Sequence, residues 1–242
     1  MQSVAVGIVC KTPIAGLSKT RLSPPLRPDE CAALSACFIR DLAATIQTIV
    51  LDGGVTGYAV YTPVGTETNL RRLLPMGFRL LPQGEGDLGA RLLRATIDLL
   101  DRGHAGAILV NSDSPTLPAA ILRAAVAAVR GGDAVVLGPA LDGGYTLIGL
   151  SQPHRRIFAD IPWSTPQVHG LTLARAAEIG VPVVNVPPWY DIDDGASLRL
   201  LEAELAGAPP PVAETGMAGA DAPATRAFLA HRAAPLRAGS SR

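Results

Sequence analysis

The sequence is short of aromatic residues and carries no net charge, and each shortage has a consequence. Phe, Trp and Tyr make up 4% of the 242 residues, whereas apolar residues make up 48%. A core of ordinary size must therefore be built mainly from Leu, Val, Ile and Ala. The 21 basic and 21 acidic residues cancel, so there is no electrostatic reason to expect nucleic acid or an anionic membrane as a partner.

Cysteine is also scarce. Cys10, Cys31 and Cys37 form no Cys-x-x-Cys pair, and their odd number argues against a disulfide framework. We expect reduced, mostly buried thiols. No basic segment precedes the apolar run at Val4, and no apolar run approaches the about 20 residues that span a bilayer. The expected location is therefore the cytoplasm.

Short apolar runs alternate with helical patterns along most of the chain. The apolar runs predict strands at residues 4–10, 58–61, 78–81, 107–110, 134–137, 145–150 and 181–186. Helical periodicity predicts helices at residues 29–49, 68–74, 87–100, 118–130, 165–179 and 195–205. This alternation favours an α/β fold whose mostly parallel sheet is covered on both faces. Such sheets bind ligands at the carboxyl ends of their strands.

The composition changes after Ala206. Residues 207–242 are rich in Ala, Pro and Gly. We expect one α/β domain over residues 1–206, followed by a flexible tail with one short helix near Ala224–His231.

A basic loop follows the first predicted strand. Lys11, Lys19 and Arg21 lie within eleven residues. Lysine offers a point charge to phosphate and arginine a bidentate fork, while Gly16 lets the backbone approach a ligand. The glycines that a P-loop requires are missing here. We predict a phosphate-binding loop of another kind; a solvated basic loop is the alternative.

A carboxylate closes the apolar strand 107–110. Asp113 follows Asn111 and Ser112 at the strand end, where a parallel sheet opens to ligands. Mg²⁺ prefers one or two carboxylates together with substrate phosphates. We predict that Asp113 binds Mg²⁺ or Mn²⁺ and that Ser112 lies beside the phosphates. The alternative is that Asp113 is a turn or cap residue.

Later strands end in further carboxylates. Asp191 and Asp193 follow the strand 181–186 two residues apart, and they can complete a metal site or bind acceptor hydroxyls. Asp194 is interpreted as the cap of the last helix. Asp142 begins an Asp-Gly-Gly segment that is also a hairpin-turn signal. Asp142 or Asp191 is the predicted catalytic base.

Two other segments lie before predicted helices. Residues 83–91 form a glycine-rich turn whose amides can attract anions, although their glycines do not match a Rossmann dinucleotide site. The nucleotide contacts predicted there are Gln83, Gly84, Asp87 and Arg91. Trp163 and Thr165 either bind an acceptor or serve packing and capping, and both interpretations stay open. The full set of predicted acceptor contacts is Gly143, Gly144, Tyr145, Trp163 and Thr165.

In this order the motifs resemble a known family. The segments KTPIAGLSKTRL, QGEGDLGARL, NSDSPTL, LGPALDGGYTLIGL, IPWST and WYDIDD are similar to those of the bacterial DUF2064 proteins, which are classed with nucleotide-diphospho-sugar transferases. The first loop also resembles that of guanylyltransferases. The resemblance implies a three-layer αβα GT-A fold with a mostly parallel mixed sheet. It implies metal ligation by Asp113 and Asp193, although the Asp-x-Asp of GT-A proteins is reduced here because position 111 is Asn.

Three functions follow from these expectations. The first is a glycosyltransferase that uses a nucleotide sugar, and the second is a nucleotidyltransferase that condenses a nucleoside triphosphate with a phosphorylated small molecule and releases pyrophosphate. The third is a non-catalytic nucleotide-binding module. The expected partners are the nucleotide and a small-molecule acceptor, without nucleic acid or membrane, and the sequence is compatible with a homodimer.

Overall fold

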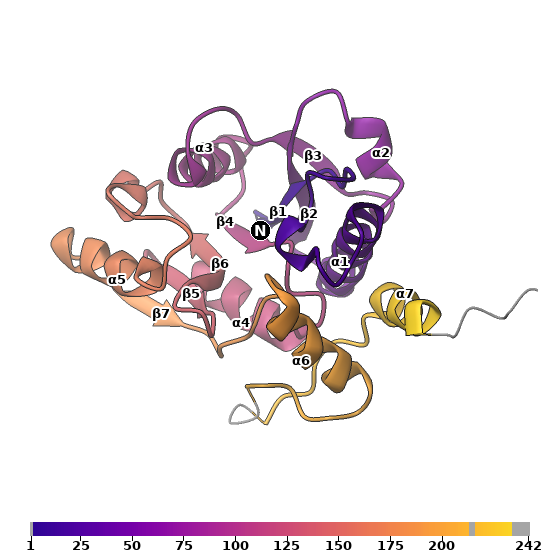
Figure 1. Cartoon of the computed structure of the whole chain (residues 1–242). Helices are drawn as coiled ribbons and strands as arrows, with labels where there is room; N and C mark the ends of the chain where they lie inside the picture. The colour runs from indigo at the N-terminus through magenta and orange to yellow at the C-terminus, as the bar shows by residue number, and fades with distance from the viewer. Residues whose placement is uncertain (1, 213–215, 234–242) are drawn as a thin grey trace, which may run out of the picture.

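A seven-stranded sheet lies at the centre of the computed structural model, which describes residues 2–212 and 216–233 (Figure 1). Its strands are β1 (Val4–Lys11), β2 (Val55–Thr62), β3 (Arg79–Pro82), β4 (Gly106–Asn111), β5 (Val135–Pro139), β6 (Tyr145–Leu150) and β7 (Val183–Asn185). The strand order is β3-β2-β1-β4-β6-β5-β7. β6 runs antiparallel to β4 and β5, while the other neighbouring pairs are parallel. The predicted α/β fold with a mostly parallel mixed sheet is confirmed.

Helices cover both faces of this sheet, which gives three layers (Figure 1). They are α1 (Pro28–Leu51), α2 (Glu67–Arg71), α3 (Leu88–Asp101), α4 (Ala119–Arg130), α5 (Val168–Glu178), α6 (Gly195–Leu205) and α7 (Pro223–Ala233), with 3₁₀ turns η1 (Thr20–Leu22) and η2 (Arg155–Phe158). Every predicted helix and strand is present. Boundaries shift by a few residues, as in β2 and α5, and the two 3₁₀ turns were not predicted.

Two apolar clusters pack against the two faces. Along β1, Val4, Val6 and Ile8 belong to the cluster under α1 and α4, whereas Ala5 lies in the cluster under α3 and α5. This alternation is the period of two that a strand imposes on its side chains. Because both faces are covered, the strand reads as a continuous apolar run in the sequence.

α1 has the length and composition of a membrane-spanning helix, as no other helix in residues 2–212 and 216–233 does. In this fold its apolar side chains pack against the sheet instead. Leu34, Phe38 and Leu42 have no exposed surface, so α1 is the main core helix of one face.

Part of the predicted tail is docked on the domain. α7 lies beside α1 (Figure 1). The buried carboxylate of Asp41 in α1 accepts hydrogen bonds from the backbone amides of Ala224 (2.9 Å) and Thr225 (2.7 Å). The short helix predicted near Ala224–His231 is α7, and these two hydrogen bonds join it to α1. Residues 213–215 and 234–242 lie outside the described part of the chain.

Replacing Asp41 by Ala should detach α7 and destabilise the protein. The carboxylate satisfies two amides of the first turn of α7, which have no partner within the helix. Charge-assisted hydrogen bonds of this kind contribute about 2 kcal/mol to stability. Urea unfolding measures the loss, and limited proteolysis should show faster cleavage before α7. Asp52→Asn, at an exposed carboxylate paired with Arg123, is the matched control; equal stability of the two variants would contradict the docking role.

Candidate functional site

Polar side chains from distant segments meet at one edge of the sheet. β1 and β4 end there at Lys11 and Asn111. Because β6 is antiparallel, the β5–β6 turn that holds Asp142 lies at the same edge. The segment after β7 is tied to this edge by two backbone hydrogen bonds, Trp189 N to Pro139 O (3.0 Å) and Ile192 N to Asp113 O (2.9 Å). The carboxylates predicted from separate motifs therefore lie together.

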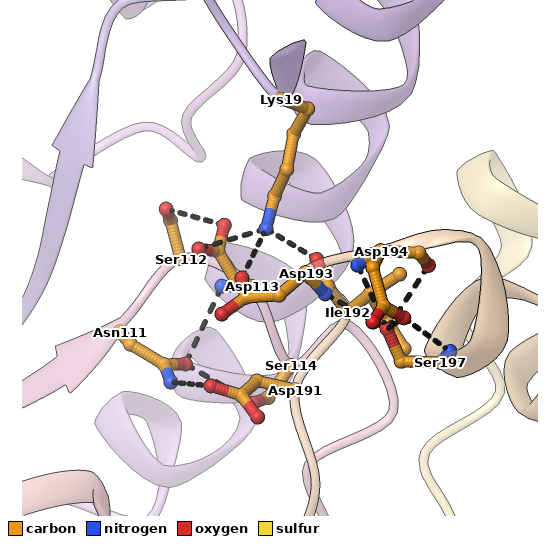
Figure 2. A network of polar contacts seen from close by, with 10 residues as sticks. All are labelled: Lys19, Asn111, Ser112, Asp113, Ser114, Asp191, Ile192, Asp193, Asp194 and Ser197. Carbon is orange, nitrogen blue, oxygen red and sulfur yellow. Dashed lines mark hydrogen bonds and ion pairs between the residues drawn. The ribbon is translucent and has the colours of Figure 1, made fainter. Parts of the chain in front are cut away.

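Lys19 lies between two of these carboxylates (Figure 2). Its Nζ is 2.9 Å from Asp113 Oδ2 and 3.1 Å from Asp193 Oδ1, and it also donates to the carbonyl of Ile192. Only 8% of the Lys19 side chain is exposed. Burial alone would lower the pKa of this ammonium group, but Asp113 and Asp193 outweigh it and raise the pKa. Lys19 therefore stays protonated and joins the first loop to the two predicted metal ligands.

Asn111 organises the loop after β4. Its Oδ1 accepts hydrogen bonds from Asp113 N (3.3 Å) and Ser114 Oγ (3.0 Å), and its Nδ2 donates to Asp191 Oδ2 (3.4 Å). Ser112 Oγ donates to Asp113 Oδ1 (3.1 Å). Asn111 thus contacts both the backbone of Asp113 and the side chain of Asp191 (Figure 2).

Three carboxylates form a second group beside the lysine bridge, by which we mean the ion pairs of Lys19 with Asp113 and Asp193. Oxygens of Asp142, Asp191 and Asp193 all lie within 4.8 Å of one another. Burial, together with the charges of Asp142, Asp193 and Asp113, raises the pKa of Asp191 to about 7. This raised pKa reflects burial first and then negative charge that Lys19 offsets only in part, and a divalent cation would stabilise such a group of carboxylates.

Two connected pockets open at this edge. The basic pocket, about 570 Å³, is lined by the cations Lys11, Lys19, Arg21 and Arg91. The acidic pocket, about 300 Å³, is lined by Asp113, Asp142, Asp191 and Asp193 and by apolar side chains. Arg21, Ser112, Asp113 and Asp193 line both, so they mark the boundary between the two pockets.

Several predicted site residues also have structural roles. Asp87 caps α3, since its Oδ1 accepts from Ala90 N at 2.8 Å. Gln83 is buried and its Nε2 donates to the carbonyls of Cys10 and Val60, both at 3.0 Å. Gly84 lines neither of the two pockets, and a Cβ at Gly143 would lie 2.3 Å from Pro166 O. Asp87 and Gln83 still line the basic pocket, but their polar atoms are largely engaged.

Most of the other predicted residues lie where the motifs placed them. Gly144, Tyr145, Trp163 and Thr165 line the acidic pocket. The Tyr145 and Trp163 rings pack edge to face, with centroids 6.4 Å apart. Asp142, Gly143 and Gly144 do form the β5–β6 turn, as the hairpin interpretation predicts, and Asp142 and Gly144 also line the acidic pocket. Asp194 caps α6 as predicted. Gly16 has a left-handed φ of 78° on the exposed loop and lines neither pocket.

Two features of the site have little or no signal in the sequence. Leu88, Leu92 and Ile148 line the acidic pocket; the signals for them are the apolar face of α3 and the apolar run of β6. Lys19 and Ser164 have left-handed backbones with φ of 49° and 64°. Such conformations are unfavourable for residues other than glycine and occur often at functional sites. No sequence pattern predicts them.

Lys11 and Lys19 are the only lysines in the chain, which allows the lysine bridge to be tested directly. Lys11 is exposed, whereas Lys19 is buried and its pKa is raised. An amine-reactive reagent needs the neutral, accessible amine, so we expect Lys19 to react at least about tenfold more slowly than Lys11. Peptide mass spectrometry measures both rates in one sample, with Lys11 as the internal control. Equal rates would contradict the ion pairs of Lys19.

Comparison with known proteins agrees with this architecture. The sequence profile of the family described as "Uncharacterized protein conserved in bacteria (DUF2064)" matches residues 45–165, which is half of the chain. The chain belongs to the DUF2064 family. A search of curated proteins gives no match to this DUF2064 chain.

Solved structures share its fold. A protein from Desulfovibrio desulfuricans G20, classed provisionally as a nucleotide-diphospho-sugar transferase, is 24% identical with a TM-score of 0.79, and the match covers 96% of each chain. A 4-diphosphocytidyl-2C-methyl-D-erythritol synthase from Anaerococcus prevotii is 9% identical with a TM-score of 0.55 over 85% of this DUF2064 chain and 96% of that one. A CMP:2-keto-3-deoxy-manno-octonic acid synthetase solved with CTP is 12% identical with a TM-score of 0.54, over 84% and 98%.

Proposed function

We propose that this protein is a metal-dependent glycosyltransferase that takes its sugar from a nucleotide-diphospho-sugar. The observation that supports this most is the junction of the two pockets, where Arg21, Asp113 and Asp193 line a basic pocket on one side and an acidic pocket on the other. A donor of this kind has an anionic diphosphate next to a neutral sugar. It would place the diphosphate among the cations and the sugar beside the carboxylates.

The carboxylates fit a divalent cation. Mg²⁺ and Mn²⁺ take hard oxygen ligands, and Mg²⁺ usually combines one or two carboxylates with substrate phosphates. We assign Asp193 and Asp113 as the ligands, since they lie at the boundary with the basic pocket. Lys19, which now pairs with both, would turn toward the diphosphate. When bound, the ion would neutralise charge on the leaving diphosphate.

The remaining carboxylates, Asp191 and Asp142, are assigned to the acceptor. Asp191 lines the acidic pocket and is oriented by Asn111 Nδ2. In the proposed reaction it takes the proton of the acceptor hydroxyl, with Asp142 beside it. Lys11, Lys19, Arg21 and Arg91 stabilise the departing nucleoside diphosphate, which is an electrostatic task that needs no covalent step from the protein.

A panel of nucleotide sugars and nucleoside triphosphates should reveal the donor in thermal-shift assays. A ligand that binds the native state raises the melting temperature by mass action, by about 2.7 kcal/mol of stability at 100 times its Kd. We expect at least one nucleotide sugar to raise the melting temperature, and to do so more strongly with Mg²⁺ or Mn²⁺ than with a chelator. If no nucleotide changes the melting temperature under any metal condition, the proposal fails.

A nucleotidyltransferase is the second candidate, because four cations in the basic pocket also suit a triphosphate. In that reaction a phosphorylated acceptor attacks the α-phosphate of a nucleoside triphosphate. The products separate the two candidates: free nucleoside diphosphate for sugar transfer, pyrophosphate for nucleotidyl transfer.

A further inference from the structure

The two pockets differ in charge, and this difference bears on the acceptor. We propose that the acceptor is an uncharged, hydroxyl-bearing compound with an apolar face, and that phosphorylated and carboxylated acceptors are rejected. This inference rests on the proposed sugar transfer and specifies the second substrate. The juxtaposition that supports it is one small pocket lined both by four carboxylates and by apolar and aromatic side chains.

The cations lie on the donor side. Of the residues that the structure describes, Arg21 alone brings a positive charge to the lining of the acidic pocket, and Arg21 also lines the basic pocket. Lys19 Nζ is engaged with Asp113 and Asp193. An acceptor phosphate in the acidic pocket would compete with the donor diphosphate for the same arginine. It would also lie in the field of Asp142 and Asp191, which disfavours an anion.

The apolar part of the lining suits an apolar face. It includes Leu88, Leu92, Ile148 and Trp163, and the Tyr145 ring packs against the Trp163 ring. Trp163 can approach α3 closely because residue 89 is glycine: a Cβ there would lie 2.6 Å from Trp163 Nε1. Aromatic rings pack well against apolar C–H faces, such as those of a sugar or cyclic alcohol. A volume of about 300 Å³ lies at the small end of ligand pockets and has to hold the donor sugar as well, so the acceptor is small.

The chemistry balances with such an acceptor. Its hydroxyl oxygen forms a bond to the anomeric carbon as the bond from that carbon to the diphosphate oxygen breaks. The bonding electron pair leaves with the nucleoside diphosphate, and the hydroxyl proton passes to the Asp191 carboxylate. No co-reactant besides donor and acceptor is needed.

Matched acceptor pairs test the proposal. Once the panel above has identified the donor, each neutral alcohol is compared with its own phosphate ester: cyclohexanol, myo-inositol, glycerol and an alkyl glucoside. Release of nucleoside diphosphate measures kcat/KM. We expect the neutral member of a pair to be preferred by on the order of 100-fold. Preference for the phosphate esters would overturn the inference while leaving the donor assignment intact.

Two variants sharpen the result. Trp163→Ala should raise the acceptor KM on the order of tenfold, and Trp163→Phe should restore most of the loss. Affinity for the free nucleoside diphosphate should not change, because Trp163 does not line the basic pocket. An unchanged acceptor KM in Trp163→Ala would contradict the binding of an apolar acceptor face by Trp163. If the nucleotide itself fails to bind the wild-type protein, the proposed function fails, which is a different outcome from either of these.

Discussion

Asp193→Asn is expected to abolish the metal-dependent part of nucleotide binding while the protein stays folded. Asp193 is the carboxylate common to the lysine bridge and to the group with Asp142 and Asp191. Mutation of residues behind metal ligands typically costs 10–100-fold in metal affinity, so loss of a direct ligand should cost at least about 100-fold. The fold should survive because Lys19 keeps its ion pair with Asp113. Titration calorimetry of the nucleotide, with Mg²⁺ and with a chelator, measures the effect.

Two further variants locate the second ligand. Asp113→Asn should match Asp193→Asn if the ion lies between these residues, since Lys19 then keeps Asp193 as its partner. If Asp191→Asn loses metal-dependent binding and Asp113→Asn does not, the ion lies in the group of three carboxylates and our ligand assignment is wrong. Asp133→Asn, at a carboxylate paired with His154, is the control. Unchanged metal dependence in Asp193→Asn would remove Asp193 from the site.

The fold could be predicted because its signals are local. Each strand is a short apolar run and each helix has its own periodicity, so pattern alone predicts the βα order. The antiparallel β6 was also indicated, through the Asp-Gly-Gly turn at Asp142 that joins it to β5. Docking of α7 was not predictable, because it depends on Asp41 meeting Ala224 across 183 positions in sequence.

The sequence indicates which polar side chains lie near this edge of the sheet, but not how they pair. Lys19 and Asp193 were each chosen because they follow strands in a parallel sheet, yet they are 174 positions apart and nothing local links them. Asp87 and Gln83 were chosen because they lie in a glycine-rich turn before a helix, but nearby backbone groups engage their side chains. A motif shows which polar groups reach the sheet edge, and only the three-dimensional structure shows which of them already have partners.

Asp191→Asn should reduce turnover on the order of 10²–10⁴-fold, the usual contribution of a general base. Asparagine keeps the shape of the side chain but cannot take the proton of the acceptor hydroxyl. Affinity for the free nucleoside diphosphate should be retained, because Asp191 does not line the basic pocket. Single-turnover release of nucleoside diphosphate, at saturating donor and acceptor, measures the chemical step. Turnover within about threefold of wild type would exclude Asp191 as the base.

The same variant should be more stable than the wild type in the absence of metal. Burial and neighbouring carboxylates raise the pKa of Asp191 from 3.8 to about 7 in the folded protein. Between these two values the native state binds more protons than the unfolded state, so this residue makes the wild type lose stability as the pH rises. The asparagine side chain does not ionise, so the variant lacks this loss of stability. Its gain in melting temperature over the wild type should therefore grow from about pH 5 to about pH 8. A variant that loses turnover and gains stability indicates that the Asp191 carboxylate is electrostatically unfavourable for folding and is needed for catalysis. Loss of turnover together with loss of stability would instead indicate a purely structural role for Asp191.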